Sequence, residues 1–432
     1  MGAGPAEDGW RRLSATALTA PDRSLGVPVP AYWGRSLPNI TTSVISALGH
    51  EAREEPAYLP PLEADLDPFS GRRAEGPIVV LLVDGLGWPD PTRASERVAA
   101  GFPEPWNERA RPITSVFPTT TTVALTSLTT AEPPSRHGVV GHRIYLPGFG
   151  VVAEILRMSP NGVGSPDALA GPAWEPAMVS GSPTVFRRGV PAVALTREKF
   201  EATAFTRMLY DGAKFVGFGT ASDFALRLAE VLRHGDGNGV IFAYWDDLDA
   251  VQHVHGPSAE FDAFEAQHVR QILAATRRRV TPELARRTTV LVTGDHGQVP
   301  ADLASEIAID RCPEILGHLA RPPTGDRRAG FLAARPGHLA ELLVALGKEL
   351  PPGHRVIPMP LALENGLFGP PPFHPEIRER VGDLLVLVPS PASLTYRLPG
   401  ALPRTRFLKG AHGGLDPAEL VIPLIAGALS EL

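Results

Sequence analysis

The chain has 432 residues, of which 43% are hydrophobic and 20% are charged. This composition is typical of a soluble globular protein, and the length allows one large α/β domain with insertions or two domains. The formal net charge is −6. The sequence therefore lacks the excess of basic residues that marks a dedicated nucleic-acid-binding protein.

The sequence contains no disulfide pair and no evident targeting segment. Its single cysteine, Cys312, excludes an intramolecular disulfide. The first residues include Glu7 and Asp8 but no apolar stretch of the kind found in a secretory signal. No apolar run approaches the roughly 18 residues of a membrane span. We therefore expect a cytoplasmic protein without a membrane segment.

Residues 1–75 are rich in proline, glycine and scattered charge. An apolar stretch lies between Pro28 and Ser46, and residues 51–75 have the composition of a loop or linker. We expect residues 1–75 to form an N-terminal extension that packs on the main domain.

The first buried strand is predicted over residues 77–83, a continuous apolar run rich in β-branched side chains. Such a run is typical of a strand buried on both faces of a parallel sheet. It ends in Asp84 and Gly85, and open α/β sheets bind ligands at the carboxyl ends of their strands. Asp84 is therefore a candidate ligand, with a turn or helix cap as the alternative.

Four successive threonines, Thr119 to Thr122, follow an apolar run at 113–117 and precede a predicted helix at about 122–128. Threonine oxygens can accept hydrogen bonds from the free N–H groups of a first helical turn, and that end of a helix favours anions. A hydroxyl held there beside a metal could be a nucleophile. The alternative is that all four residues only shape and cap the turn.

The rest of the chain alternates between strand and helix patterns. Strands are predicted at 191–195, 239–244, 288–292 and 420–425, and helices at 221–233 and 261–279. This alternation predicts an α/β fold with a mostly parallel central sheet and helices on both faces, built from residues 76–299 and 406–432. Residues 300–405 carry strand-like and helical runs of their own, and we expect them to form a smaller α+β insertion that caps the site.

Further acidic and histidine residues follow the predicted strands. Asp249 and His253 come after the strand at 239–244, Asp295 and His296 after the strand at 288–292, and His412 lies in a glycine-flanked loop. If the strands are parallel, their carboxyl ends share one rim and gather these residues there with Asp84 and the threonines. Mixed Asp and His ligands suit zinc and also tolerate manganese or iron. Each motif alone could equally be a turn or a surface loop.

Taken together, the motifs resemble the alkaline phosphatase superfamily, in its nucleotide pyrophosphatase/phosphodiesterase branch, from about residue 78 to the C-terminus. The matching segments are Asp84-Gly85, Phe117-Pro118-Thr119-Thr120-Thr121, Thr130 to Gly138, Tyr244 with Asp249, His253, Gly256 and Pro257, Asp295-His296-Gly297, and His412-Gly413-Gly414.

The resemblance implies a role for each matching residue. Thr121, four residues after Phe117, would be the nucleophile. One divalent metal would be held by Asp84, Thr121, Asp295 and His296, and a second by Asp249, His253 and His412. The implied reaction is hydrolysis of phosphodiester or pyrophosphate bonds in small, nucleotide-like phosphate esters through a phospho-threonine intermediate. The metals, zinc in the first place, would make the hydroxyl alkoxide-like.

Three positions depart from the family pattern. Thr122 stands where an aromatic residue often stacks on a nucleobase, and His142 stands where an asparagine often contacts the phosphoryl oxygens. Ala131 replaces a glycine. His142 and Thr122 are therefore candidate substrate-binding residues. A phosphomonoesterase or a phosphonate C–P hydrolase with the same metals is one alternative function, and a non-catalytic metal- or ligand-binding homologue is another.

Overall fold

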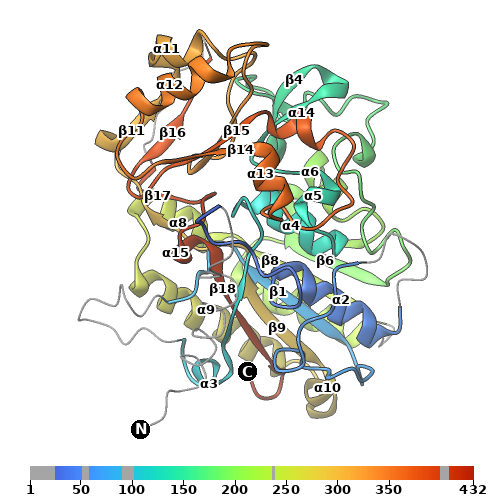
Figure 1. The fold of residues 1–432 in the computed structure, drawn as a ribbon. Coiled ribbons are helices and arrows are strands. Elements are labelled where there is room, and N and C mark those ends of the chain that lie inside the picture. The colour runs from blue at the N-terminus through green and yellow to red at the C-terminus, as the bar shows by residue number, and fades with distance from the viewer. Residues whose placement is uncertain (1–24, 51–57, 90–101, 236–238, 399–407) are drawn as a thin grey trace.

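The predicted strand at 78–83 forms β1 (Ile78–Val83), the middle strand of a seven-stranded sheet in the computed structural model (Figure 1). The structure describes residues 25–50, 58–89, 102–235, 239–398 and 408–432. Every residue of β1 is at most 1% exposed. The strands of this central sheet lie in the order β2 (Arg111–Thr114), β18 (Val421–Ala428), β9 (Thr289–Gly294), β1, β8 (Val240–Trp245), β6 (Ala192–Arg197) and β7 (Lys214–Phe218).

The neighbouring strands β9, β1, β8, β6 and β7 run parallel. At one side of the sheet, β18 runs antiparallel to both β9 and β2. The prediction of a mostly parallel central sheet is therefore confirmed. Because parallel strands end together, the segments that follow β9, β1 and β8 meet at one edge.

Helices cover both faces of the central sheet. Side chains of β1 alternate between two hydrophobic cores, with Val80 in one and Leu81 in the other. The first core includes α2 (Leu37–Leu48) and α4 (Thr121–Thr130), and the second includes α7 (Ala221–His234) and α9 (Ala259–Arg277). Each fully buried Val, Leu or Ile side chain contributes about 1.5–3 kcal/mol, so the two cores fix the sheet between its helices.

The helix α2 supports the helix that carries Thr121. It begins after Ser36, which forms a capping box with Asn39, and Pro38 in its first turn is compatible with a helix start. Thr41 Oγ1 donates a hydrogen bond to the backbone oxygen of Leu128 in α4 at 2.6 Å. Residues 1–24 and 51–57 of the predicted N-terminal extension lie outside the described residues.

A second seven-stranded sheet lies above the central sheet in the view of Figure 1, and its strand pairs are all antiparallel. We call this sheet, together with β11 (Glu306–Ala308), β16 (Ser393–Thr395) and the helices α11 (Pro313–Leu316), α12 (Leu339–Glu349), α13 (Met359–Glu364) and α14 (Ile377–Val381), the cap. The strand order is β14 (Arg355–Pro358), β15 (Leu384–Leu387), β13 (Ala329–Leu332), β12 (Thr324–Gly325), β3 (Arg143–Leu146), β4 (Val151–Glu154) and β5 (Ser159–Pro160).

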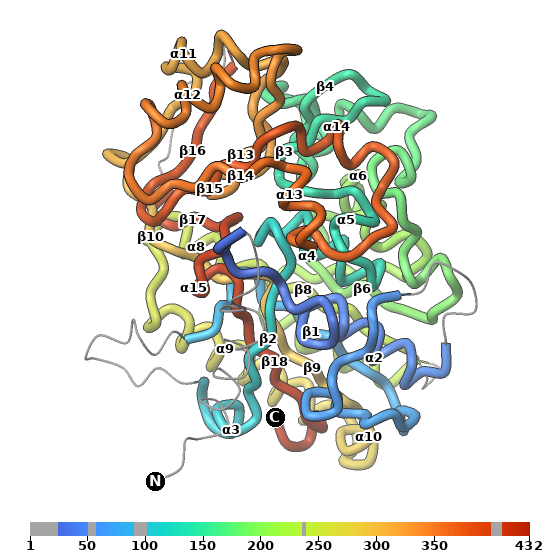
Figure 2. Tube along the Cα trace, in the orientation of Figure 1, coloured from blue at the N-terminus to red at the C-terminus, as the bar shows by residue number. Residues whose placement is uncertain are grey.

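The cap is built from two segments that are far apart in sequence. Figure 2 shows β3, in blue-green, beside the orange strands of the later segment, and Gly325 of β12 pairs with Arg143 of β3. The sheet of the cap thus draws on residues 143–160 as well as on the 300–405 segment that we predicted as the insertion. Local patterns in these short strands carry no sign of that long-range pairing.

Several shorter helices and strands connect these elements. They are α3 (Trp106–Arg109), α5 (Pro134–His137), α6 (Ala204–Leu209), α8 (Asp247–His255), α10 (Pro282–Arg287), α15 (Pro417–Leu420) and the pair β10 (Val299–Pro300) with β17 (Gly410–Ala411). Within the residues that the structure describes, no helix combines the length and the apolar character of a membrane span.

The threonine run differs in detail from its predicted role. The helix α4 begins at Thr121, one residue before the predicted start, and the side chain of its N-cap residue, Thr120, makes no capping hydrogen bond. The hydroxyl of Thr119 instead donates to Gly414 O at 2.9 Å and accepts from Gly413 N at 3.0 Å. The alternative that the threonines cap the helix thus does not hold for the N-cap residue Thr120. Thr119 shapes the turn by binding a segment nearly three hundred residues later.

Candidate metal centre and active site

The predicted ligand residues follow three adjacent strands of the central sheet. Asp84 follows β1, Asp249 lies in α8 after β8, and Asp295 follows β9. Val83 at the end of β1 pairs with Trp245 on one side and with Gly294 on the other, so the three strands end level with one another. Parallel strand direction thus brings the three carboxylates to one edge of the sheet.

The histidines reach the same place from different segments. Asp249 and His253 are one helical turn apart in α8, and His253 Nε2 lies 3.3 Å from Asp249 Oδ1. His412 follows β17, and its Nε2 lies 3.9 Å from the same oxygen. The rings of His296 and His412 stack with centroids 3.8 Å apart. Six of the seven predicted metal-site residues therefore carry their donor atoms into one cluster; the seventh, Thr121, lies beside them.

Thr121 presents its hydroxyl to this cluster from the first turn of α4. Its Oγ1 lies 3.2 Å from His296 Nε2 and 3.5 Å from Asp84 Oδ1. Because the unpaired N–H groups and the dipole of a helix favour negative charge at its N-terminus, α4 presents the hydroxyl at a place suited to an anionic substrate.

The three histidines are oriented in the same way. Each places Nδ1 within hydrogen-bond distance of a backbone oxygen: His253 with Gly410 at 2.9 Å, His412 with Thr119 at 2.9 Å and His296 with Gly297 at 3.1 Å. A proton on Nδ1 satisfies each bond and leaves the lone pair on Nε2. Nε2 faces the carboxylates in all three cases, which is the arrangement that prepares histidine to bind a metal.

The carboxylates fit a cation for an electrostatic reason. Burial and the nearby charges of Asp295 and Asp249 raise the pKa of Asp84 well above its ordinary value. Asp295 Oδ2 is buried and has no hydrogen-bond partner among the described residues. Buried carboxylates that repel each other are stabilised by a bound cation, and so is a buried carboxylate oxygen without a donor. The residues present therefore fit divalent metals.

Geometry groups the donors in two overlapping sets. Asp249, His253 and His412 can converge on one ion, as the resemblance implies. Asp84, Asp249 and His296 can converge on another. Asp249 therefore belongs to both sets, and Asp295 lies next to the second set with Oδ2 at 3.3 Å from His296 Nε2.

The two predicted substrate-binding residues line the cavity at this centre, in different ways. Thr122 is 1% exposed, and its hydroxyl donates to Gly141 O at 3.0 Å. Its side chain thus holds the loop before His142 in place. The backbone N–H of His142 donates to Asp326 Oδ2 at 3.2 Å. Burial, followed by the charges of Arg143, Arg327 and His253, lowers the pKa of His142 to about 4.

Sequence reasoning missed Gln298 and Asp326 as residues of this site, and it named Tyr244 in a matching segment without giving it a role. The hydroxyl of Tyr244, at the end of β8, donates to Asp84 Oδ2, and Gln298 Nε2 donates to Asp249 Oδ1 at 2.5 Å. Asp326, from the cap, is 5% exposed and lines the cavity. The position of Tyr244 one residue before the end of a buried strand was an available signal. Asp326 had none, because only the pairing of β12 with β3 brings it to the site.

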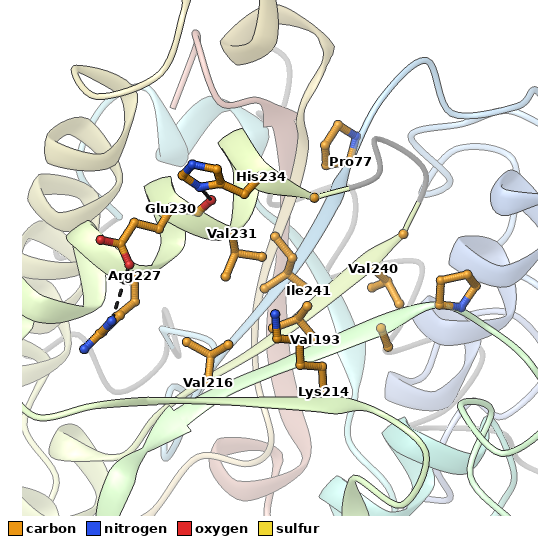
Figure 3. A pocket seen from close by; sticks show the side chains of 14 residues that line it. Pro77, Val193, Lys214, Val216, Arg227, Glu230, Val231, His234, Val240 and Ile241 are labelled. Atoms are coloured by element: carbon orange, nitrogen blue, oxygen red, sulfur yellow. Dashed lines mark hydrogen bonds and ion pairs between the residues drawn. The ribbon is translucent and has the colours of Figure 1, made fainter.

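A different cavity lies at the opposite edge of the central sheet (Figure 3). It opens where β6, β7 and β8 begin, between apolar side chains such as Val193, Val216 and Ile241. Arg227 and Glu230 of α7, with 3.4 Å between their charged groups, lie at its side. None of the predicted site residues lines this cavity, so the chemistry belongs to the edge where the strands end.

The carboxylates and imidazoles meet at the edge where the parallel strands end, beside a hydroxyl at the N-terminus of a helix. This arrangement is the architecture of the alkaline phosphatase superfamily. The model of one family, described as type I phosphodiesterase / nucleotide pyrophosphatase, matches residues 78–415. The chain belongs to that family, and it is accordingly a hydrolase. No curated protein sequence gives a significant match.

Solved structures share the fold at low sequence identity. Murine ectonucleotide pyrophosphatase / phosphodiesterase 5 matches with a TM-score of 0.59 and 16% identity over 81% of this chain and 87% of its own. An inactive threonine-to-alanine variant of that protein, in complex with AMP, matches equally well. Phosphonoacetate hydrolase from Sinorhizobium meliloti 1021, in complex with phosphonoacetate, matches with a TM-score of 0.55 and 19% identity over 82% of this chain and 91% of its own.

Proposed function

We propose that the chain hydrolyses phosphodiester or pyrophosphate bonds of small phosphate esters, with Thr121 as the nucleophile. The observation that carries this proposal is the position of Thr121 Oγ1, 3.2 Å from His296 Nε2 and 3.5 Å from Asp84 Oδ1 at the N-terminus of α4. A hydroxyl that only capped the helix would point at the backbone of the first turn rather than at a cluster of metal-ligand types.

The reaction proceeds in two displacements. Thr121 Oγ1 loses its proton and forms a bond to phosphorus while the bond from phosphorus to the leaving oxygen breaks. This gives a phospho-threonine, and the leaving group departs as an alcohol or phosphate that takes up a proton. Water then attacks the phosphorus, breaks its bond to Oγ1 and supplies the proton that restores the hydroxyl. The N–H groups of the first turn of α4 favour the anionic phosphoryl group in both steps.

The metal-binding residues are divided between two ions in this proposal. Asp249, His253 and His412 hold one, and Asp84, Asp295 and His296 with Thr121 hold the other, with Asp249 within reach of both. Two divalent ions held there, with zinc expected and manganese or iron as alternatives, would favour the ionised hydroxyl and offset charge on the phosphoryl oxygens. Tyr244 and Gln298 fix the carboxylates of Asp84 and Asp249 by donating hydrogen bonds to them.

The substrate class has a second candidate. A phosphonate C–P hydrolase or a phosphomonoesterase with the same residues is supported by Thr122, whose buried side chain offers no surface for a nucleobase, and by the likeness to phosphonoacetate hydrolase. A metal-binding homologue without activity is the remaining alternative. The likeness to a protein that binds AMP supports nucleotide-like esters.

The test compares three substrates and three forms of the zinc-loaded chain. Bis(p-nitrophenyl) phosphate, p-nitrophenyl phosphate and phosphonoacetate are each given to the wild type, Thr121→Ala and Thr121→Ser. We expect the diester to be the best substrate and Thr121→Ala to lower kcat by about 10³-fold or more, because the nucleophile is removed. Thr121→Ser keeps a hydroxyl and is the matched control, which should retain measurable activity.

The outcomes separate the candidates. A phosphate group found on Thr121 after rapid quenching of the wild type, and missing in Thr121→Ala, supports the covalent step. Faster turnover of phosphonoacetate or the monoester would replace the diester as substrate class. Full activity in Thr121→Ala would reject the proposed nucleophile, and no turnover of any of the three by a metal-loaded chain would favour the non-catalytic homologue.

A further inference from the structure

The cavity in front of Thr121 has a volume of about 500 Å³ and is shared between the central-sheet site and the cap. One wall consists of Thr121 and the metal-ligand candidates Asp249, His253 and His412. A second part of the lining, called here the second wall, consists of cap residues. The role of the second wall rests on the proposed function in one respect: the first wall is taken to receive the phosphoryl group.

Three arginines of the cap line the cavity: Arg143, Arg327 and Arg397. They come from separate segments that the fold places side by side. Arg143 in β3 pairs with Gly325, two residues before Arg327. The backbone oxygen of Arg327 accepts a hydrogen bond at 2.6 Å from Leu394 N, three residues before Arg397. The three guanidinium groups therefore belong to one wall.

The position of His142 shows that this wall faces the metal-ligand cluster. His142 lines the same cavity as the ligand candidates His253 and His412. It directly precedes Arg143 in the chain, and its backbone N–H donates to Asp326 Oδ2 at 3.2 Å, next to Arg327. A molecule bound at the first wall therefore shares its cavity with the guanidinium groups.

Acidic residues of the cap lie near the arginines. Glu154 lines the cavity, stands opposite Arg143 in the pairing of β3 with β4, and lies 3.8 Å from Arg157. Asp326 is buried, accepts from His142 N, and has a pKa raised by burial to about 6. Arg327 has Glu306 at 3.9 Å as a partner. The arginines are thus held in place by protein contacts, and the cap part of the cavity lining contains three arginines beside the two acidic residues Glu154 and Asp326.

The same wall is poor in aromatic surface. Among the described residues that line the cavity, Tyr396 is the one aromatic side chain other than histidine. Thr122 is buried and bonded to Gly141 O. Charge rather than stacking is therefore the means by which this cavity can recognise the part of a substrate that is not cleaved.

We propose that the substrate carries a second anionic group, a carboxylate or a phosphate, on the side away from the bond that is cleaved, and that Arg143, Arg327 and Arg397 bind this group. Guanidinium groups bind both kinds of oxyanion through paired, charge-assisted hydrogen bonds. The cavity thereby selects compact esters or phosphonates with two separated anionic ends.

Binding of inert ligands tests the inference without any turnover. The zinc-loaded full-length chain is titrated by calorimetry with propylphosphonate, 3-phosphonopropionate and propane-1,3-diphosphonate, which share a phosphonate and a three-carbon chain. We expect the two ligands with a second anion to bind about 10-fold or more tightly than propylphosphonate. Their order relative to each other identifies carboxylate or phosphate as the preferred group.

Three variants assign the effect to the arginines. The measured ratio is the affinity for a ligand with a second anion divided by the affinity for propylphosphonate. Arg143→Gln, Arg327→Gln and Arg397→Gln should each bring this ratio closer to one. Arg378→Gln, an exposed cap position that does not line the cavity, is the matched control and should keep the wild-type ratio. Circular dichroism of each variant checks folding. Equal affinities in the wild type, or a ratio unchanged in all three cavity variants, would overturn the inference.

A kinetic comparison separates this inference from the proposed function. Two diesters, ethyl p-nitrophenyl phosphate and 2-carboxyethyl p-nitrophenyl phosphate, differ only in the carboxylate that serves as the second anion. Turnover with a preference for the carboxyethyl ester supports both proposals, and equal turnover of both esters overturns the inference while keeping the hydrolase. Selective binding of 3-phosphonopropionate without turnover of either ester keeps the inference and rejects the phosphodiesterase proposal.

Discussion

The central sheet and the cap sheet each contain seven strands, but they differ in strand direction. The central sheet is mostly parallel, so residues that follow its strands meet at one edge. The cap sheet is antiparallel, and its strands come from two distant parts of the chain. In our proposal the first arrangement supplies the reacting groups, and the second supplies the wall that chooses the substrate.

This comparison predicts that metal removal acts on the central sheet edge alone. We expect a chelator to abolish diester hydrolysis and added zinc to restore it. Since ions that bind the folded state stabilise it by about 3–4 kcal/mol at 100–1,000 times Kd, the melting temperature should fall on chelation as well. Activity, metal content by mass spectrometry and thermal unfolding are the measurements.

A pair of variants on α8 sharpens the same prediction. We expect the wild type to bind about two ions per chain. Asp249→Asn should bind fewer, because Asp249 belongs to both donor sets. Asp247→Asn is the control on the same helix, where the carboxylate pairs with Arg197 instead. Full hydrolysis by metal-free protein, or equal metal content in both variants, would contradict the assignment.

The next largest effect, a loss of stability, is expected at the joint between cap and central sheet, by which we mean the ion pair that connects them. Arg328 of the cap and Glu419 of α15 form an ion pair at 3.2 Å, with side chains 3% and 0% exposed. Arg328→Gln leaves the Glu419 carboxylate buried without its cation, and such a loss destabilises by about 3–5 kcal/mol. Urea unfolding measures the change in the free energy of unfolding.

The exposed pair Arg227–Glu230, with both side chains 47% exposed, is the control for this joint. Arg227→Gln should change the free energy of unfolding by only about 0–1 kcal/mol. A loss below about 1 kcal/mol in Arg328→Gln would show that the joint does not depend on this pair.

A smaller, pH-dependent effect is expected where α14 of the cap meets the loops after α5. Burial and the charge of Arg380 lower the pKa of His374 to about 4, and His374 Nδ1 accepts from Glu376 N at 3.1 Å. The unfolded chain, with an ordinary histidine pKa, binds this proton at higher pH than the folded chain does. Stability therefore falls between about pH 6.5 and pH 4, by at most about 3 kcal/mol.

Unfolding of His374→Gln across that pH range checks the effect, because glutamine cannot take up the proton. Its free energy of unfolding should fall less steeply with decreasing pH than that of the wild type. His234→Gln replaces an exposed histidine of α7 and should leave the slope unchanged. Identical slopes in all three proteins would show that His374 is not protonated differently in the folded and unfolded chains.

Much of the central sheet could be predicted from local patterns, and its two edge strands, β2 and β7, could not. The predicted strands at 77–83 and 239–244 lie within one residue of β1 and β8, because strands buried on both faces are continuous apolar runs. β7 was missed: it lies at the edge of the sheet, is partly exposed, and contains Gly217, so its pattern is weak.

The candidate site divides in the same way. Asp84, Asp249 and Asp295 were identified because each follows a recognisable strand, and Thr121 because of its distance from Phe117. Asp326 and Arg143 were not identified as site residues. They reach the cavity only through strand pairs between segments about 180 residues apart, which are formed by backbone hydrogen bonds and need no matching pattern of side chains.

The sequence by itself therefore determined the fold class, the family and the residues gathered at the carboxyl edge of the parallel strands. The tertiary structure decided that Asp249 is within reach of both donor sets, that Thr119 ties the turn before Thr121 to the loop after His412, and that three arginines line one cavity. The physical reason is the distance along the chain over which the residues interact. The ends of strands are marked by residues close in sequence, whereas the cavity is closed by contacts between segments far apart in sequence.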